Sequence, residues 1–123
     1  MDFELKNNLD NIMKKLHIQP VGNGYIDLIC PVKKIGEFID CMEQLGIKIK
    51  GFTWWCHVHD SHPACGLGGP QSQYSDGWFS EIPANEITYF ESNDKLKQYL
   101  LEDYPNCPQY KECYVPAFWL DLD

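Results

Sequence analysis

The period of the apolar residues limits what this chain can fold into more than any other feature, because it changes along the sequence. Apolar residues three and four apart predict amphipathic helices over about residues 2–16 and 32–45. The two apolar stripes consist of Leu5, Leu9, Ile12 and Leu16, and of Ile35, Phe38, Ile39, Met42 and Leu45. Gly46 is placed to end the second helix, since glycine tolerates the left-handed conformation found there.

The segments between these helices alternate or are β-rich, which predicts strands. The predicted strands cover residues 25–30, 47–55, 78–82 and 86–90, with a bulge at Gly51 and a short hairpin arm at 17–21. Ser92 is expected to cap a third helix that ends near residue 104. A last strand over 114–120 contains Pro116 and is therefore expected at the sheet edge. The pattern predicts a single α+β domain over 1–123, with about three helices packed on a mainly antiparallel sheet.

The chain shows no sign of a membrane or secreted protein. At 123 residues it is long enough for one domain with its own core, and no apolar run reaches the roughly 20 residues of a membrane helix. The opening MDFELKNNLD lacks the cationic start and apolar stretch of a secretion signal. We therefore expect a cytoplasmic protein with no membrane partner, and we expect its six cysteines to be reduced thiols.

The negative charge is concentrated in the second half of the chain. Residues 1–75 carry 8 acids and 7 lysines, whereas residues 76–123 carry 10 acids and 3 lysines, and the chain has no arginine. Arginine is the preferred residue for phosphate and base contacts, and an acidic field repels a polyanion, so nucleic acid is excluded as an expected ligand. The same field attracts and steers a basic protein partner.

One stretch, residues 51–82, gathers three of the four histidines and three of the four tryptophans. From Val58 to Asp76 it is rich in glycine, histidine and polar residues, which predicts one long loop. Loops longer than about 12–15 residues without regular structure are usually functional or disordered. This loop has tryptophans at both ends, so we interpret it as functional.

The middle of this stretch has the composition of a metal site. The candidate zinc ligands are His57, His59, His62 and Cys65. On a strand, His57 and His59 share one face, and a return of the chain would add the other two. The spacing, however, matches neither the paired C-x₂-C of structural zinc sites nor the helical H-E-x-x-H. We therefore expect no cofactor, with zinc as the alternative, since histidines on a polar loop are the simpler interpretation.

Two other kinds of chemistry are weaker interpretations of the same stretch. Cys65 with His59 or His62 would suit a thiolate nucleophile, but Cys56 and His57 are neighbours on a strand and point to opposite faces. The run from Gly66 to Pro70 resembles a phosphate-binding loop only in composition, because no lysine or helical period follows it. We interpret it as a tight turn.

Aromatic and acidic residues around the loop predict a protein-binding surface, because Trp and Tyr are enriched in interface hot spots. The predicted surface consists of Trp54, Trp55, Tyr74, Asp76, Trp78, Glu81 and Glu86. Trp54 and Trp55 are adjacent, so they must face opposite sides of a strand and at least one leaves the main core. The competing interpretation is that the rings only fix the loop to the sheet.

These features favour a non-enzymatic acidic binding domain that binds a basic protein. One concrete form is an immunity-type protein that neutralises a cationic bacterial toxin, such as a nuclease. The alternative is a zinc-binding protein, or a small zinc-dependent hydrolase, that uses the cluster between Cys56 and Cys65. A third possibility is a purely structural metal site inside a binding domain.

Overall fold

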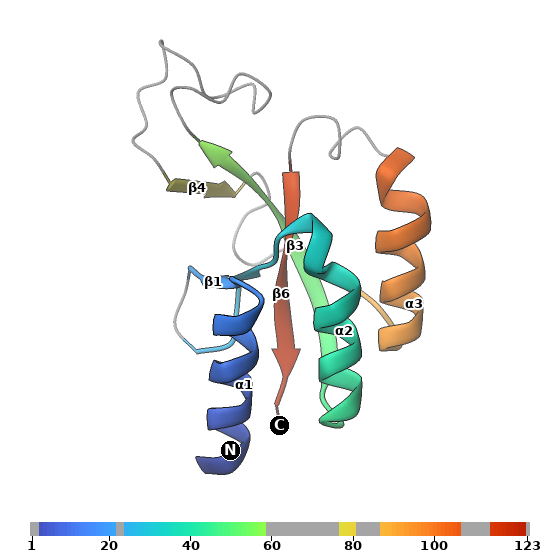
Figure 1. Cartoon of the computed structure of the whole chain (residues 1–123). Coiled ribbons are helices and arrows are strands. Elements are labelled where there is room, and N and C mark those ends of the chain that lie inside the picture. The colour runs from blue at the N-terminus through green and yellow to red at the C-terminus, as the bar shows by residue number, and fades with distance from the viewer. Residues whose placement is uncertain (1–2, 22–23, 59–76, 81–86, 107–113, 123) are drawn as a thin grey trace.

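The computed structural model describes residues 3–21, 24–58, 77–80, 87–106 and 114–122, and for 56–58 and 77–80 it describes the backbone. Three helices pack on one face of an antiparallel sheet, as the α+β pattern predicts (Figure 1). The helices are α1 (Phe3–Lys15), α2 (Ile35–Gln44) and α3 (Asn93–Gln98). The strands are β1 (Gln19–Pro20), β2 (Leu28–Ile29), β3 (Lys48–Val58), β4 (Gly77–Ser80), β5 (Thr88–Tyr89) and β6 (Tyr114–Asp121).

The sheet has the order β1-β2-β6-β3-β4, and β5 pairs with β3 beside β4. The pairing of β1 with β2 confirms the predicted hairpin arm at 17–21. Phe118 of β6 lies opposite both Leu28 of β2 and Phe52 of β3, so these three side chains share one face. All three are fully buried beneath the helices, where Phe118 stacks on Phe38 of α2 with ring centroids 5.1 Å apart.

The prediction that the last strand lies at the sheet edge is wrong, because β6 is central between β2 and β3 (Figure 1). Pro116 is tolerated there for a local reason. Its carbonyl oxygen accepts a hydrogen bond of 3.3 Å from the amide of Cys30, one residue beyond the end of β2. In an antiparallel strand the N and O of one residue face the same neighbour, so the missing N–H faces the end of β2 and removes no bond to β3.

The predicted bulge in β3 is confirmed. The register shifts between Ile49, which pairs with Leu120, and Gly51, which pairs with Trp119, so Lys50 is the extra residue. Side chains of a regular strand alternate between the two faces of the sheet, and the extra residue shifts this alternation by one position. Ile49 and Phe52 therefore both face the helices although they are three residues apart. At Gly51 the backbone of β5 approaches so closely that a Cβ would lie 2.1 Å from the carbonyl oxygen of Thr88.

Helices α1 and α2 end in the same way. The amide of Ile18 bonds to the carbonyl of Met13 at 2.8 Å, and the amide of Ile47 bonds to that of Met42 at 2.9 Å. The residue before each of these amides is left-handed, His17 with φ 58° and Gly46 with φ 70°. This is the Schellman arrangement, and it confirms the predicted role of Gly46.

The third helical segment begins as predicted, with the Ser92 hydroxyl accepting a 3.2 Å hydrogen bond from the amide of Lys95. It continues past α3 as a π-helical turn over Tyr99–Asp103 and a 3₁₀ turn over Tyr104–Asn106. The buried Tyr104 hydroxyl donates to the carbonyl oxygen of Tyr114 and so ties this end to β6. Among the described residues, no helix is long and apolar enough to cross a bilayer.

The predicted strand over 25–30 is only partly present, because β2 is limited to Leu28–Ile29. Asp27 has a φ of 56°, a left-handed conformation that a regular strand cannot contain. Residues 25–27 nevertheless stay beside β6, since the amide of Leu120 bonds to the carbonyl of Tyr25 at 3.1 Å. This departure from the strand places the Asp27 side chain at the candidate site.

Candidate functional site

The candidate site lies on the sheet face opposite the helices. Thr53 of β3 pairs with Ala117 of β6 on that face, and both are buried, with 1% and 0% of their surface exposed. Trp55 follows two residues after Thr53 on β3, and Trp119 follows two residues after Ala117 on β6, so both share this face. Because the strands are antiparallel, the two tryptophans flank the Thr53–Ala117 pair from opposite ends.

The Asp27 carboxylate joins these side chains through a single oxygen. Its Oδ1 accepts hydrogen bonds from the Thr53 hydroxyl at 2.8 Å and from the Trp119 indole Nε1 at 2.8 Å. The Trp55 indole Nε1 donates to the Thr53 hydroxyl at 2.8 Å and lies 3.3 Å from the same Asp27 oxygen. We call Asp27, Thr53, Trp55 and Trp119 the Asp27 cluster.

The backbone holds Asp27 in place from both sides. Its carbonyl oxygen accepts from the amide of Val21 at 3.2 Å, and Tyr25 bonds to β6 two residues earlier. Aspartate tolerates the left-handed conformation better than most residues, but the conformation is still strained. Such strain is common where a side chain is positioned for a task, and here it directs the carboxylate between the two indoles.

Among the described residues, no cation balances the negative charge of the Asp27 cluster. The described donors to Oδ1 are all neutral, and none of the described residues donates to Oδ2. An ion pair among the described residues lies on the helical side of the sheet instead, where Lys97 Nζ is 2.7 Å from Asp40 Oδ1. Asp27, Trp55 and Trp119 are each half-buried, so the cluster keeps some contact with solvent.

A hollow of about 410 Å³ lies beside the Asp27 cluster and shares Trp119 with it. Its lining includes Gly24, Tyr25, Ile26, Lys50, Trp119 and Asp121. Ile26, which lines the hollow, is 42% exposed. The Tyr25 hydroxyl donates to Asp10 at 3.0 Å, and burial together with the Asp10 carboxylate raises the pKa of Tyr25.

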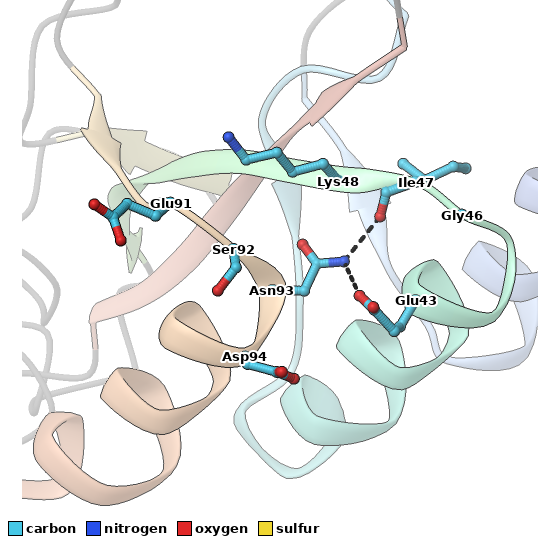
Figure 2. A pocket seen from close by; sticks show the side chains of 8 residues that line it. All are labelled: Glu43, Gly46, Ile47, Lys48, Glu91, Ser92, Asn93 and Asp94. Carbon is cyan, nitrogen blue, oxygen red and sulfur yellow. Dashed lines mark hydrogen bonds between the residues drawn. The ribbon is translucent and has the colours of Figure 1, made fainter.

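A second hollow, of about 270 Å³, surrounds Asn93 where α3 begins (Figure 2). The Asn93 amide donates to Glu43 Oε2 at 2.7 Å and to the Ile47 carbonyl at 2.9 Å, and its oxygen accepts from the Ile49 amide at 2.8 Å. Figure 2 shows that Glu91 points away from Glu43, and that the Asp94 carboxylate lies apart from the Glu43 carboxylate, so the three do not converge on one point. Asn93 joins the turn after α2 to the start of α3, so we interpret this hollow as structural.

The described residues show only part of the predicted metal cluster. His57 lies on β3 opposite Trp78 of β4, whereas His59, His62 and Cys65 lie outside the described residues. In the ranges that the structure describes, no group of three His, Cys, Asp or Glu side chains is placed to hold a metal ion.

The predicted binding surface divides between the two faces of the sheet. Trp54 is 7% exposed in the helix-covered core, with its ring 4.7 Å from Phe52 and 5.0 Å from Tyr104. Trp55 faces the other way, as expected for adjacent residues on a strand, and belongs to the Asp27 cluster. The backbone of Trp78 lies on β4, and the other members, Tyr74, Asp76, Glu81 and Glu86, lie outside the described residues.

Sequence reasoning did not identify Asp27 or Thr53 as site residues. Both lie in segments read as ordinary strand, and the strand pattern alone does not distinguish them. The available signal was an aspartate inside an otherwise apolar run, Tyr25 to Cys30, where a charged side chain needs a partner.

Comparison of the chain with models of protein families, with curated proteins and with solved structures gave no match.

Proposed function

We propose that this protein is a non-enzymatic, cytoplasmic binding domain that binds a basic protein. The observation that carries the proposal is the Asp27 cluster, a half-buried carboxylate between two half-buried indoles with no cation paired to it in the described residues. Tryptophan is enriched among residues that dominate binding energy, and an acidic surface speeds the encounter with a cationic partner. The net charge of −8 without a single arginine agrees with this role.

The concrete form that we favour is an immunity-type protein that neutralises a cationic bacterial toxin. Such a partner, for example a nuclease, presents lysine and arginine side chains on the surface that contacts nucleic acid. An acidic domain that covers this surface blocks it without any catalysis of its own. The acidic residues Asp76, Glu81 and Glu86 of the predicted surface would add to the attraction.

Binding is tested by titration calorimetry against small cationic nucleases, with neutral and acidic proteins of similar mass for comparison. We expect saturable binding to a cationic protein, and an affinity that falls as NaCl is raised from about 50 to 500 mM. Equal affinity for cationic, neutral and acidic proteins, or an affinity that does not change with salt, would contradict the proposal.

A matched pair of charge-reversal variants then locates the surface. Replacing Asp76, Glu81 and Glu86 by lysine changes the net charge from −8 to −2, because each reversal adds two charges. Replacing Glu4, Glu37 and Asp40 of α1 and α2 by lysine gives the same net charge elsewhere on the molecule. We expect the first variant to lose at least tenfold more affinity than the second, and equal losses would contradict the predicted surface.

The alternative function is a zinc-binding protein that uses His57, His59, His62 and Cys65. One observation favours it: β3 and β4 pair up to Val58 and Gly77, so the segment between them leaves and returns at adjacent positions. The segment that contains the other candidate ligands, His59, His62 and Cys65, therefore begins directly after the strand that carries His57. Elemental analysis of protein purified without chelator, with thiol titration, tests this: about one zinc per chain and protected thiols would support it, and metal-free protein would contradict it.

A further inference from the structure

We infer that the Asp27 cluster is the receptor for one cationic side chain, arginine or lysine, of the partner. The inference rests on the proposed function, because it names the part of a basic protein that this chain would bind. It requires three features: an acceptor oxygen that is free, neighbouring side chains that are fixed and attract a cation, and a role for the negative charge that asparagine could not fill.

The free acceptor is Asp27 Oδ2. Three hydrogen bonds from described residues reach this side chain, and all three end on Oδ1, at 2.8, 3.3 and 2.8 Å. Within the part of the chain that the structure describes, Oδ2 has no donor. A carboxylate has room for about four hydrogen bonds on its two oxygens, so a donor from another molecule can bind without displacing those already present.

The surround suits a cation because its two aromatic rings are fixed. The Trp119 indole is held through Nε1 by Asp27, and the Trp55 indole is held through Nε1 by Thr53. The electron-rich faces of indoles attract ammonium and guanidinium groups, and an arginine plane also stacks on them. Rings that are already held by hydrogen bonds lose little freedom when a ligand binds, which favours affinity.

The Asp27 carboxylate has a charge and a second oxygen that a purely structural hydrogen-bond acceptor would not need. An asparagine oxygen would accept the same bonds from Thr53 and the two indoles, without a charge that must be kept partly out of water. Aspartate adds only the negative charge and the second oxygen. A cation that approaches Oδ2 uses both. Among the described residues no lysine forms an ion pair with Asp27: Lys97 pairs with Asp40, and Lys50, which lines the neighbouring hollow, lies over the Tyr89 ring at 5.7 Å from its centroid.

The test uses the full chain and needs no identified partner. Nitrogen-15 spectra resolve the indole N–H signals of the four tryptophans, and the probes are the N-acetyl methylamides of arginine and lysine. The matched control is the same derivative of citrulline, which has the shape of arginine without its charge. We expect saturable shifts of the Trp55 and Trp119 signals with both cations, no shift of the core residue Trp54, and no shift with citrulline.

The variant Asp27→Asn keeps the acceptor and removes the charge, and we expect it to lose at least tenfold in affinity for both probes. Asp40→Asn on α2 is the control that removes one charge on the other side of the sheet, and it should bind like the unaltered protein. Equal shifts with citrulline, or unchanged binding by a folded Asp27→Asn variant, would overturn the inference. If that variant does not fold, the comparison of arginine with citrulline on the unaltered protein decides.

The two proposals fail separately. If a basic protein binds the Asp27→Asn variant as tightly as the unaltered protein, the receptor role of the Asp27 cluster is wrong and the proposed binding function stands. If the amino-acid probes shift the two indoles but no basic protein binds, the receptor is correct and the proposed function is wrong.

Discussion

At the scale of single residues, Asn93 shows how one buried polar side chain can join three parts of a fold. It is 5% exposed and forms three hydrogen bonds, two to Glu43 and the Ile47 carbonyl (Figure 2) and one to the Ile49 amide. Two of these partners are backbone groups of the buried residues Ile47 and Ile49. The side chain therefore fixes the entrance to β3 and the start of α3 together.

We predict that Asn93→Ala lowers the free energy of unfolding by about 2–3 kcal/mol, because it leaves buried backbone groups without partners. Urea denaturation followed by tryptophan fluorescence measures the change. Asn106→Ala is the control, since Asn106 is exposed and makes one long bond of 3.4 Å, and it should change stability by less than about 0.5 kcal/mol. Similar losses in the two variants would contradict the role assigned to Asn93.

The buried thiol of Cys30 makes the free energy of unfolding depend on pH in the alkaline range. Burial raises the pKa of its thiol from 9.0 to about 12 in the folded protein. Unfolding therefore releases a proton between these values, so we predict that the free energy of unfolding is unaffected by this group below pH 9 and falls as the pH rises above it. The slope reaches about 1.4 kcal/mol per pH unit. Denaturation from pH 8 to 11 should show this slope, and Cys30→Ala should reduce it.

At the scale of whole elements, the bulge in β3 controls where β5 can lie. Gly51 pairs with Tyr89 of β5 on one side and with Trp119 of β6 on the other. Only a residue without a side chain allows the Thr88 carbonyl to approach as closely as it does. The short strand β5 depends on this contact and on the 3.3 Å bond from the Phe90 amide to Lys50.

We predict that Gly51→Ala displaces β5 and destabilises the protein by about 1–3 kcal/mol, since its Cβ would meet Thr88 O at 2.1 Å. Gly36→Ala in α2 is the matched control, because its Cβ would meet only Leu101 Cδ1 at 3.5 Å and alanine favours the helix. We expect it to stabilise by up to about 1 kcal/mol. Amide exchange at Phe90 should be faster in the first variant alone.

The sequence predicts best those elements whose signal is local. The stripes of α1 and α2, the left-handed Gly46 and the Ser92 cap all depend on residues within a few positions of one another, and the structure confirms them. The position of β6 depends instead on which strands lie beside it. A proline is excluded from a central strand only if its N–H is needed, and for Pro116 that is decided by the end of β2, far away in the chain.

The same distinction explains the candidate site. The sequence predicts that at least one of Trp54 and Trp55 leaves the main core, because adjacent residues on a strand face opposite sides, and Trp55 is the one that does. Asp27 was not predicted as a site residue, because its partners lie 26, 28 and 92 residues away and its own backbone leaves the strand pattern. No local pattern connects such residues. The site appears only once β3 and β6 are paired.

At the scale of the whole molecule, charge is the dominant feature. Eighteen acids face ten lysines, and in the described residues one ion pair joins such groups, between exposed side chains of α2 and α3. A field of one sign keeps a protein soluble and also opposes its compact state through repulsion. Stability and binding should therefore respond to salt in opposite directions.

We predict that raising NaCl from about 10 to 300 mM increases the free energy of unfolding by about 1 kcal/mol, roughly 4 °C in Tm, because salt screens the repulsion. The lysine variant of Glu4, Glu37 and Asp40, with a net charge of −2, should respond less. Calorimetry measures both. A Tm that falls with salt would show that attractive pairs, and not repulsion, dominate the field.

The central place of β6 also bears on the synthesis of the chain. Strands β2 and β3 are translated early, but the strand that joins them is translated last among the described elements. At about 5–20 residues per second, the ribosome needs roughly 3–11 s between the end of β3 and the start of β6. During these seconds two strand edges and the apolar residues Phe52 and Ile29 lack their neighbour. Unpaired strand edges and exposed apolar surface favour aggregation, so we expect the nascent chain to be most prone to aggregation during this interval.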